Sequence, residues 1–220
     1  MDFKLILTFL KNLSKNNDRD WFEKNKPKYL SAKENFDAFV AALLDKMIPV
    51  DSSLVGLNPK KLTFRIYRDV RFSKDKSPYK TNMGATFSGG GKLMQTPGYY
   101  LHIEPGNKSF VAGGLYVPPA DILAKVRQEI DYNPKKLHAI LNNAKFKKTF
   151  GMLDDFDKLK TAPKGYPKDH PQLDLLKHKS FIVSHYFKDK EVMDSKFMKH
   201  VVDTYKVLKP LNDYLMEAID

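Results

Sequence analysis

Residues 61–85 read KLTFRIYRDVRFSKDKSPYKTNMGA, an alternating stretch that passes into a dense polar loop. Apolar side chains first occupy every second position, namely Leu62, Phe64, Ile66, Val70 and Phe72. Successive side chains of an extended chain point to opposite faces, so the alternation predicts a half-buried β-strand over residues 62–72. Arg68 falls on the apolar side of this pattern. A guanidinium there requires a carboxylate or a bound anion as its partner.

The loop after this strand combines positive charge, hydroxyl groups and aromatic rings. Arginine binds phosphate or carboxylate through a planar fork, and aromatic rings stack on bases or sugars. Loops at the ends of strands often carry binding sites. An anion-binding site is therefore predicted from Arg65, Tyr67, Arg68, Arg71, Ser73, Lys74, Lys76, Tyr79 and Lys80.

The same loop has a purely structural interpretation. Asp69 and Asp75 lie among the cations and are available to pair with them, which would make the motif a clasp around Arg68. We prefer anion binding because the cations outnumber the acids in this stretch, and the clasp stays open as the alternative.

Several stretches of the chain carry a resemblance to a known family. They are RDVRFSKDKSPYKTNMGA at 68–85, DRDWFEKNK at 18–26, PGYYLHIEPGN at 97–107, GGLYVPP at 113–119 and HPQLDLLKHKSF at 170–181. Over nearly its whole length the chain resembles a family of conserved hypothetical proteins, a domain of unknown function widespread in bacteria and also found in fungi. The resemblance implies a compact α+β domain and implies no activity, cofactor or catalytic residue.

Composition describes a basic globular protein. The 220 residues are 42% hydrophobic and 29% charged, which is typical of a soluble domain with a substantial core. No internal repeat or linker interrupts them, so one domain over residues 1–220 is expected. The formal net charge of +12 favours anionic partners such as nucleic acid or nucleotides, although exposed lysines also serve solubility alone.

Several classes of site and location are disfavoured. The chain has no cysteine, which excludes disulfides, thiolate catalysis and zinc sites built on sulfur. The N-terminal run is interrupted by Lys4 and suits an amphipathic helix better than a signal peptide. No apolar run approaches the ~20 residues that span a bilayer, so we expect a cytoplasmic protein without a membrane partner.

Periodicity and turn residues place the remaining elements. Helices are expected after a cap at Asp2 with an apolar stripe from Phe3 to Leu13, at 19–24 after Asp18, from Pro27 to residue 48, after Pro119, after a cap at Asn133, at 173–177, and from residue 195 with a kink at Pro210. Strands are expected at 62–72, 82–88, 99–104, 109–115 and 181–187. The prediction is an α+β fold, with an antiparallel sheet covered by N-terminal and C-terminal helices.

Two short motifs do not support the chemistry that they suggest. The run GGGK at 89–92 lacks the Walker glycine, since residue 86 is Thr86, and Leu93 follows its lysine, so a mobile hairpin tip is expected instead. The two Ser-x-x-Lys matches at 73–76 and 77–80 lie in a turn-rich loop containing Pro78, which disfavours the helical turn that acyl-enzyme chemistry needs.

The histidines do not have metal-binding spacing, and no metal site is expected. The best local pair is His102 and Glu104, which share a strand face with Tyr100. A hydrogen-bonded pair is the preferred interpretation, because a third ligand would have to come from elsewhere. His185 shares the parity of an apolar strand face and is expected to be buried and hydrogen-bonded.

Three functions remain open. The first is a binding module for a phosphorylated ligand or nucleic acid at residues 65–81. The second is an enzyme acting on an anionic substrate, with Asp69 or Glu104 as general base, His102 as a further acid–base candidate and the arginines as electrostatic stabilisers. The third is a scaffold whose basic surface meets an acidic protein. The sequence identifies no cofactor.

Overall fold

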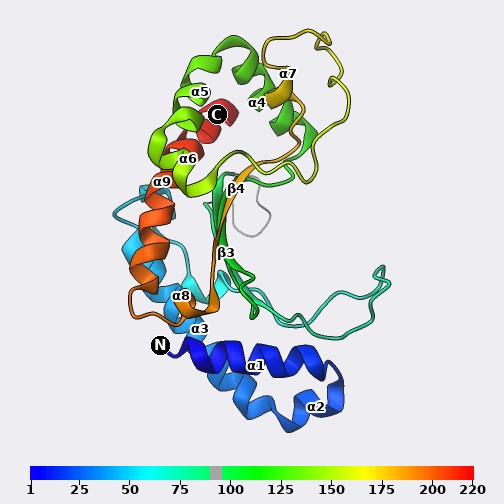
Figure 1. The fold of residues 1–220 in the computed structure, drawn as a ribbon, viewed down its shortest axis with the longest axis vertical. Helices are drawn as coiled ribbons and strands as arrows, with labels where there is room; N and C mark the ends of the chain where they lie inside the picture. The colour runs from blue at the N-terminus through cyan, green and yellow to red at the C-terminus, as the bar shows by residue number, and fades with distance from the viewer. Residues whose placement is uncertain (90–95) are drawn as a thin grey trace. The chain divides into compact units, whose positions relative to one another are not determined.

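The computed structural model describes residues 1–89 and 96–220 and has an α+β fold (Figure 1). One four-stranded antiparallel sheet has the order β1-β2-β3-β4, so strands that are neighbours in the chain are neighbours in the sheet. The strands are β1 (Met83–Phe87), β2 (Gly98–Ile103), β3 (Ser109–Leu115) and β4 (Phe181–Phe187). The expected fold class and these four strands are confirmed.

Packing divides the chain into two compact units. Unit 1 contains Met1–Phe87, Tyr100–Val111 and Tyr186–Val202, and unit 2 contains Ser88–Tyr99, Ala112–His185 and Asp203–Asp220. Three divisions fall inside strands, one falls inside α9 and one lies at the end of β1, so neither unit is a continuous piece of sequence. One domain over residues 1–220 stays a proposal.

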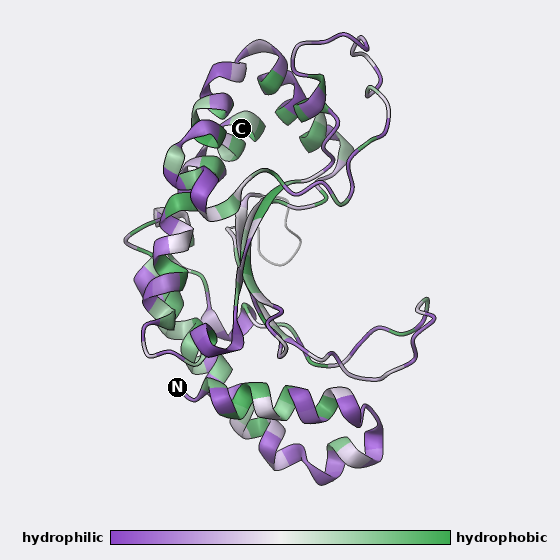
Figure 2. Cartoon of the chain, viewed as in Figure 1, coloured by the Kyte–Doolittle hydropathy of each residue, from purple (hydrophilic) through white to green (hydrophobic). Residues whose placement is uncertain are grey.

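The first two helices of unit 1 begin at the caps predicted for them. The helices of this unit are α1 (Phe3–Lys15), α2 (Arg19–Lys24), α3 (Lys26–Met47), α8 (Asp189–Val192) and the start of α9 (Phe197–Ile219), with short 3-10 turns at Ser52–Leu54 and Pro59–Lys61. The carboxylate of Asp2 accepts the N–H of Leu5, and that of Asp18 accepts the N–H of Trp21. Hydrophobic and hydrophilic residues are interspersed along α1 and α2, as expected of helices with one apolar face (Figure 2).

The core of unit 1 combines the first helices of the chain with the start of its last helix. The ring of Phe3 lies 4.8 Å from that of Phe39 and 5.0 Å from that of Phe197, both edge-on. α3 also contacts β1. Helices from both termini therefore bury the same apolar cluster beside the sheet.

Unit 2 contains α4 (Ala120–Tyr132), α5 (Pro134–Asn142), α6 (Ala144–Phe150), α7 (Leu173–Leu176) and the remainder of α9. α9 continues through Pro210, and its part in unit 2 packs against β2. The ring of Tyr205 packs 4.9 Å from that of Tyr99, and the amide of Asn212 donates to the carbonyl of Gly98 at 3.2 Å. The expected C-terminal covering helix is confirmed.

Residues 62–72 do not form the predicted strand. They make only isolated antiparallel bridges, Thr63 with Ala85 and Tyr67 with Tyr79. The N–H of Arg68 donates to the carbonyl of Pro78 at 2.9 Å, but proline has no N–H to return, so a continuous ladder cannot extend there.

Three further expectations need correction or a limit. Asn133 occupies the N-cap position of α5, as expected, but its side chain makes no capping hydrogen bond; its amide nitrogen donates to Glu129 at 3.2 Å. His185 is half-buried rather than buried, although its Nδ1 does hydrogen-bond to the carbonyl of Thr149 at 2.9 Å. The predicted glycine tip falls mostly on residues 90–91, outside the described residues. Within residues 1–89 and 96–220, no helix combines the length and apolarity needed to cross a membrane.

Candidate functional site

Residues 64–81 of unit 1 form a two-limbed loop, called here the basic loop. Figure 1 shows its limbs side by side, in cyan to teal, running out to a tip. The bridge between Tyr67 and Tyr79 joins the limbs, with the N–H of Lys80 donating to the carbonyl of Ile66 at 2.8 Å. All nine residues predicted to bind an anion lie on this loop.

Tyr79 anchors the basic loop to the helices. Its ring is 3% exposed and stacks on Phe22 of α2, with centroids 3.9 Å apart and planes 13° apart. The Asn17 side chain accepts the N–H of Tyr79 at 3.1 Å and donates to its carbonyl at 2.9 Å. Tyr79 is therefore not available to stack on a ligand. Sequence reasoning missed Asn17 and Phe22 because nothing local marks a contact so distant in the chain.

Arg68 is held inside the loop by a clasp. Its guanidinium pairs with Asp75 and also donates to the Ser73 hydroxyl at 3.3 Å and to the Ser77 carbonyl at 3.4 Å. Hydrogen bonds to Asp75 from the Ser77 hydroxyl and backbone, and then from Arg68, lower the pKa of Asp75 to about 2. Arg68 is thus paired with a carboxylate of its own loop, as the clasp interpretation requires.

Arg71 and Asp69 form a second internal pair. The guanidinium donates to the two carboxylate oxygens at 3.0 and 2.7 Å. The hydrogen bonds from the Arg71 side chain and backbone lower the pKa of Asp69. A carboxylate with a lowered pKa is a weaker proton acceptor, so this geometry does not favour Asp69 as a general base.

Phe72 lies beside this pair and points away from the protein. Its ring is 96% exposed, and the Arg71 guanidinium carbon lies 5.9 Å from the ring centroid. The alternating pattern had assigned Phe72 to the buried face of a strand, which is wrong. The chain turns back at residues 73–77, so no layer of side chains lies against that face.

The remaining cations differ in how they are held. The amine of Lys76 donates to the carbonyl of Val70 at 3.0 Å, and that of Lys80 lies 5.4 Å from the Phe64 ring centroid. Arg65 and Lys74 are exposed. Each acid of the loop is thus paired with one arginine, and Arg65, Lys74 and Lys76 are exposed to solvent.

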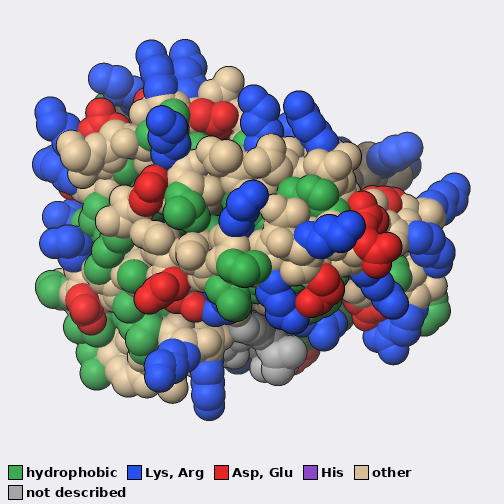
Figure 3. Space-filling model, turned by 90° about the horizontal axis from the view of Figure 1, so that it is seen from below, with side chains coloured by type: hydrophobic (Ala, Val, Ile, Leu, Met, Phe, Trp, Pro, Cys, Tyr) green, Lys and Arg blue, Asp and Glu red, His purple; other side chains and the backbone are tan. Residues whose placement is uncertain are grey.

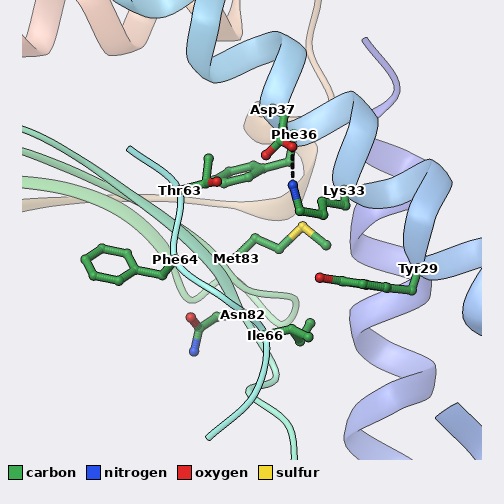
Figure 4. Close-up of a pocket in the computed structure, with 9 residues that line it drawn as sticks. All are labelled: Tyr29, Lys33, Phe36, Asp37, Thr63, Phe64, Ile66, Asn82 and Met83. Carbon is green, nitrogen blue, oxygen red and sulfur yellow. Dashed lines mark hydrogen bonds and ion pairs between the residues drawn. The ribbon is translucent and has the colours of Figure 1, made fainter. Parts of the chain in front are cut away.

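A pocket lies where the base of the basic loop meets α3 (Figure 4). It is lined by Tyr29, Lys33, Phe36, Asp37, Thr63, Phe64, Ile66, Asn82 and Met83. Figure 4 shows its two charged residues, Lys33 and Asp37, paired with each other, while the Phe64 ring is directed away from α3. Because the charges neutralise each other, this pocket offers no net charge to an ionic ligand.

A hydrogen-bonded chain occupies the half-exposed face of β2. The Nε2 of His102 lies 2.9 Å from Glu104 Oε2, and its Nδ1 lies 3.2 Å from the Tyr100 hydroxyl. Burial lowers the pKa of His102, and the Glu104 carboxylate opposes that shift. The structure thus brings together the three residues that share a strand face in the sequence. Glu104 is engaged by His102, which leaves the imidazole rather than the carboxylate as the group facing a hydroxyl.

Charge is otherwise dispersed. Figure 3 shows one face of the molecule, where Lys and Arg side chains project with Asp and Glu among them. Among the described residues, no group of three or more His, Cys, Asp or Glu side chains has the arrangement to hold a metal ion. The local excess of cations on the basic loop is therefore a better indicator of where an anion could bind than the net charge of the chain.

Comparison with known proteins gives a family and no activity. The family model described as conserved hypothetical protein DUF2461 matches residues 5–214. Comparisons with curated proteins and with solved structures found no match. The match covers nearly all of the sequence, and the chain therefore belongs to the DUF2461 family of conserved hypothetical proteins.

Proposed function

We propose that the chain is a binding module for a phosphorylated ligand, and that the basic loop holds a single strand of nucleic acid. The observation that carries this proposal is Phe72, an aromatic ring 96% exposed beside a guanidinium. Single-strand binding proteins combine such rings, on which unstacked bases lie, with cations that follow the backbone.

The arrangement of charge supports a chain of phosphates. Arg65 lies on the outgoing limb, Lys74 near the tip and Lys76 on the returning limb, and all three are exposed. Cations spread along a loop suit successive phosphates better than one small anion, which is usually held by several groups that converge. The internal pairs of Arg68 and Arg71 then stabilise the loop that presents them.

The test is binding of a fluorescently labelled single-stranded oligonucleotide, followed by anisotropy over a series of salt concentrations. Counterion release predicts that the logarithm of the binding constant falls by about 0.7 per phosphate contact for each tenfold rise in salt. Lys74→Ala should reduce that slope by about 0.7. Lys164→Ala removes an exposed lysine of unit 2 and should leave the slope unchanged.

No binding at the lowest salt concentration would overturn the nucleic-acid form of the proposal. The small-anion form is tested by melting in sulfate or phosphate against chloride at equal ionic strength. Sulfate stabilises proteins generally, so the comparison is with Arg65→Ala and Lys76→Ala. Smaller shifts in these variants would support a small-anion site. Equal shifts in all three proteins would leave the basic loop as a structural clasp.

A further inference from the structure

The basic loop does not use the hydrogen-bonded chain on β2, which has the arrangement of a nucleophile, a base and an orienting carboxylate. Tyr100, His102 and Glu104 occupy alternate positions and therefore share one face of the strand, while Tyr99, Leu101 and Ile103 are buried on the other. Activated nucleophiles generally lie within hydrogen-bonding reach of a base that a third group orients.

The network assigns the proton positions. A carboxylate accepts hydrogen bonds, so the Glu104 oxygen 2.9 Å from Nε2 places the ring hydrogen on that nitrogen. Nδ1 then carries the lone pair, and it lies 3.2 Å from the Tyr100 hydroxyl. The phenol therefore donates its proton toward a base that Glu104 holds in the accepting tautomer.

Neighbouring residues fix this geometry. The ring of Phe110 stacks on the imidazole with centroids 4.6 Å apart and planes 19° apart. Gly84 of β1 leaves room for the phenol, because a Cβ there would lie 2.7 Å from the Tyr100 hydroxyl oxygen. Both rings are thus held in place, while Tyr100 and His102 each remain partly exposed.

Two cations stand at the ends of the chain. The Lys108 amine lies 3.6 Å from Glu104, and the Lys80 amine lies over the ring of Phe64, whose centroid is 6.2 Å from that of Tyr100. Lys108 thus lies beside the carboxylate end of the hydrogen-bonded chain, and Lys80 lies beside a ring that neighbours Tyr100, a distribution of positive charge that favours a negatively charged substrate.

We propose that Tyr100 is a nucleophile for phosphodiester transfer, with His102 as its general base and Glu104 as a positioning residue. The phenol oxygen forms a bond to phosphorus, its proton passes to Nδ1 of His102, and the bond from phosphorus to the leaving oxygen breaks. The leaving oxygen lies opposite the phenol in such a displacement and takes a proton from water, while His102 keeps the phenol proton, so the products are a phosphotyrosyl adduct and an alcohol. The choice of a phosphodiester rests on the proposed nucleic-acid function, whereas the activated tyrosine does not.

The nucleophile is tested with phenylmethanesulfonyl fluoride on the intact protein. Attack by the phenol forms a sulfonate ester and releases fluoride, and peptide mass spectrometry locates the label. Tyr100 should be labelled at least about 10-fold faster than Tyr132, an internal reference that is 70% exposed. His102→Gln should remove that advantage. Because burial lowers the pKa of His102, the wild-type rate should rise with pH through an inflection below 6.5.

The variant Glu104→Gln distinguishes a role of Glu104 in positioning His102 from a role in stabilising the fold. It should reduce labelling of Tyr100 and shift the pH profile while leaving the melting temperature near that of the wild type. Labelling of Tyr100 no faster than that of Tyr132, or wild-type rates in His102→Gln, would overturn the nucleophile. Melting curves of the variants serve as the control that each one is folded.

The phosphodiester is tested separately. A single-stranded oligonucleotide is incubated with the protein and quenched in denaturant, and a covalent adduct is sought on Tyr100, with Tyr100→Phe as the control. Rapid sulfonylation without an adduct would overturn the phosphodiester class and leave the activated tyrosine intact. Since binding is measured by anisotropy, a failure of the binding function is distinguished from a failure of this step.

Discussion

Tyr79→Ala should destabilise the fold by about 3 kcal/mol, because Tyr79 fastens the basic loop to the helices. The side chain is 3% exposed, and its ring lies flat on Phe22 at 3.9 Å. Removing a large buried aromatic side chain costs about 3–5 kcal/mol, and the cost falls when the surroundings can close over the gap. Because the basic loop is attached at one side only, it can partly close over the gap, and we therefore expect a destabilisation at the lower end of these values.

The assay is urea unfolding followed by circular dichroism, with limited trypsin digestion as a local probe. The matched control is Tyr67→Ala on the opposite limb, whose side chain is 48% exposed and should cost less than about 1 kcal/mol. Trypsin should cut Tyr79→Ala faster after Lys74 and Lys76, since the released loop becomes accessible. Equal unfolding midpoints and equal digestion rates for the two variants would refute the anchoring role of Tyr79.

Two other predictions concern backbone geometry and pH. Gly114→Ala should destabilise the protein by about 2–6 kcal/mol, measured by urea unfolding, because residue 114 has φ +119° and a Cβ would collide with the Phe181 carbonyl oxygen; a wild-type midpoint would contradict this close approach. Hydrogen bonds from Ser77, and then Arg68, lower the pKa of Asp75 from 3.8 to about 2, so its contribution is complete above pH 3.8 and is lost as pH falls toward 2. The melting temperatures of wild type and Asp75→Asn should therefore converge over that range, and a constant difference would show that Asp75 does not stabilise the loop.

Features set by neighbouring residues could be predicted from the sequence. The caps at Asp2 and Asp18 were predictable because a capping side chain bonds to residues only three positions away. The pairing of His102 with Glu104 followed from the two-residue period of a strand. The same period correctly assigned Ile66 to a buried position.

Features set by distant contacts could not be predicted. Alternation reports which side a residue faces only while the chain stays extended, so it placed Phe72 inward although the loop turns back there. Asn17 binds a backbone 62 positions away, and no local pattern marks such a pair. The division into two units could not be predicted either, because four of its five boundaries fall inside strands or a helix that the sequence presents as continuous elements.

The proposed binding function is tested most directly by Phe72→Ala, measured as the dissociation constant for a labelled single-stranded oligonucleotide at fixed low salt. Stacking of one base on an aromatic ring contributes about 1–3 kcal/mol, so the variant should bind about 5- to 150-fold more weakly than wild type. Phe156→Ala removes a ring of unit 2 that is 59% exposed and should bind as the wild type does. Equal affinities for wild type, Phe72→Ala and Phe156→Ala would contradict the assignment of the basic loop as a nucleic-acid site.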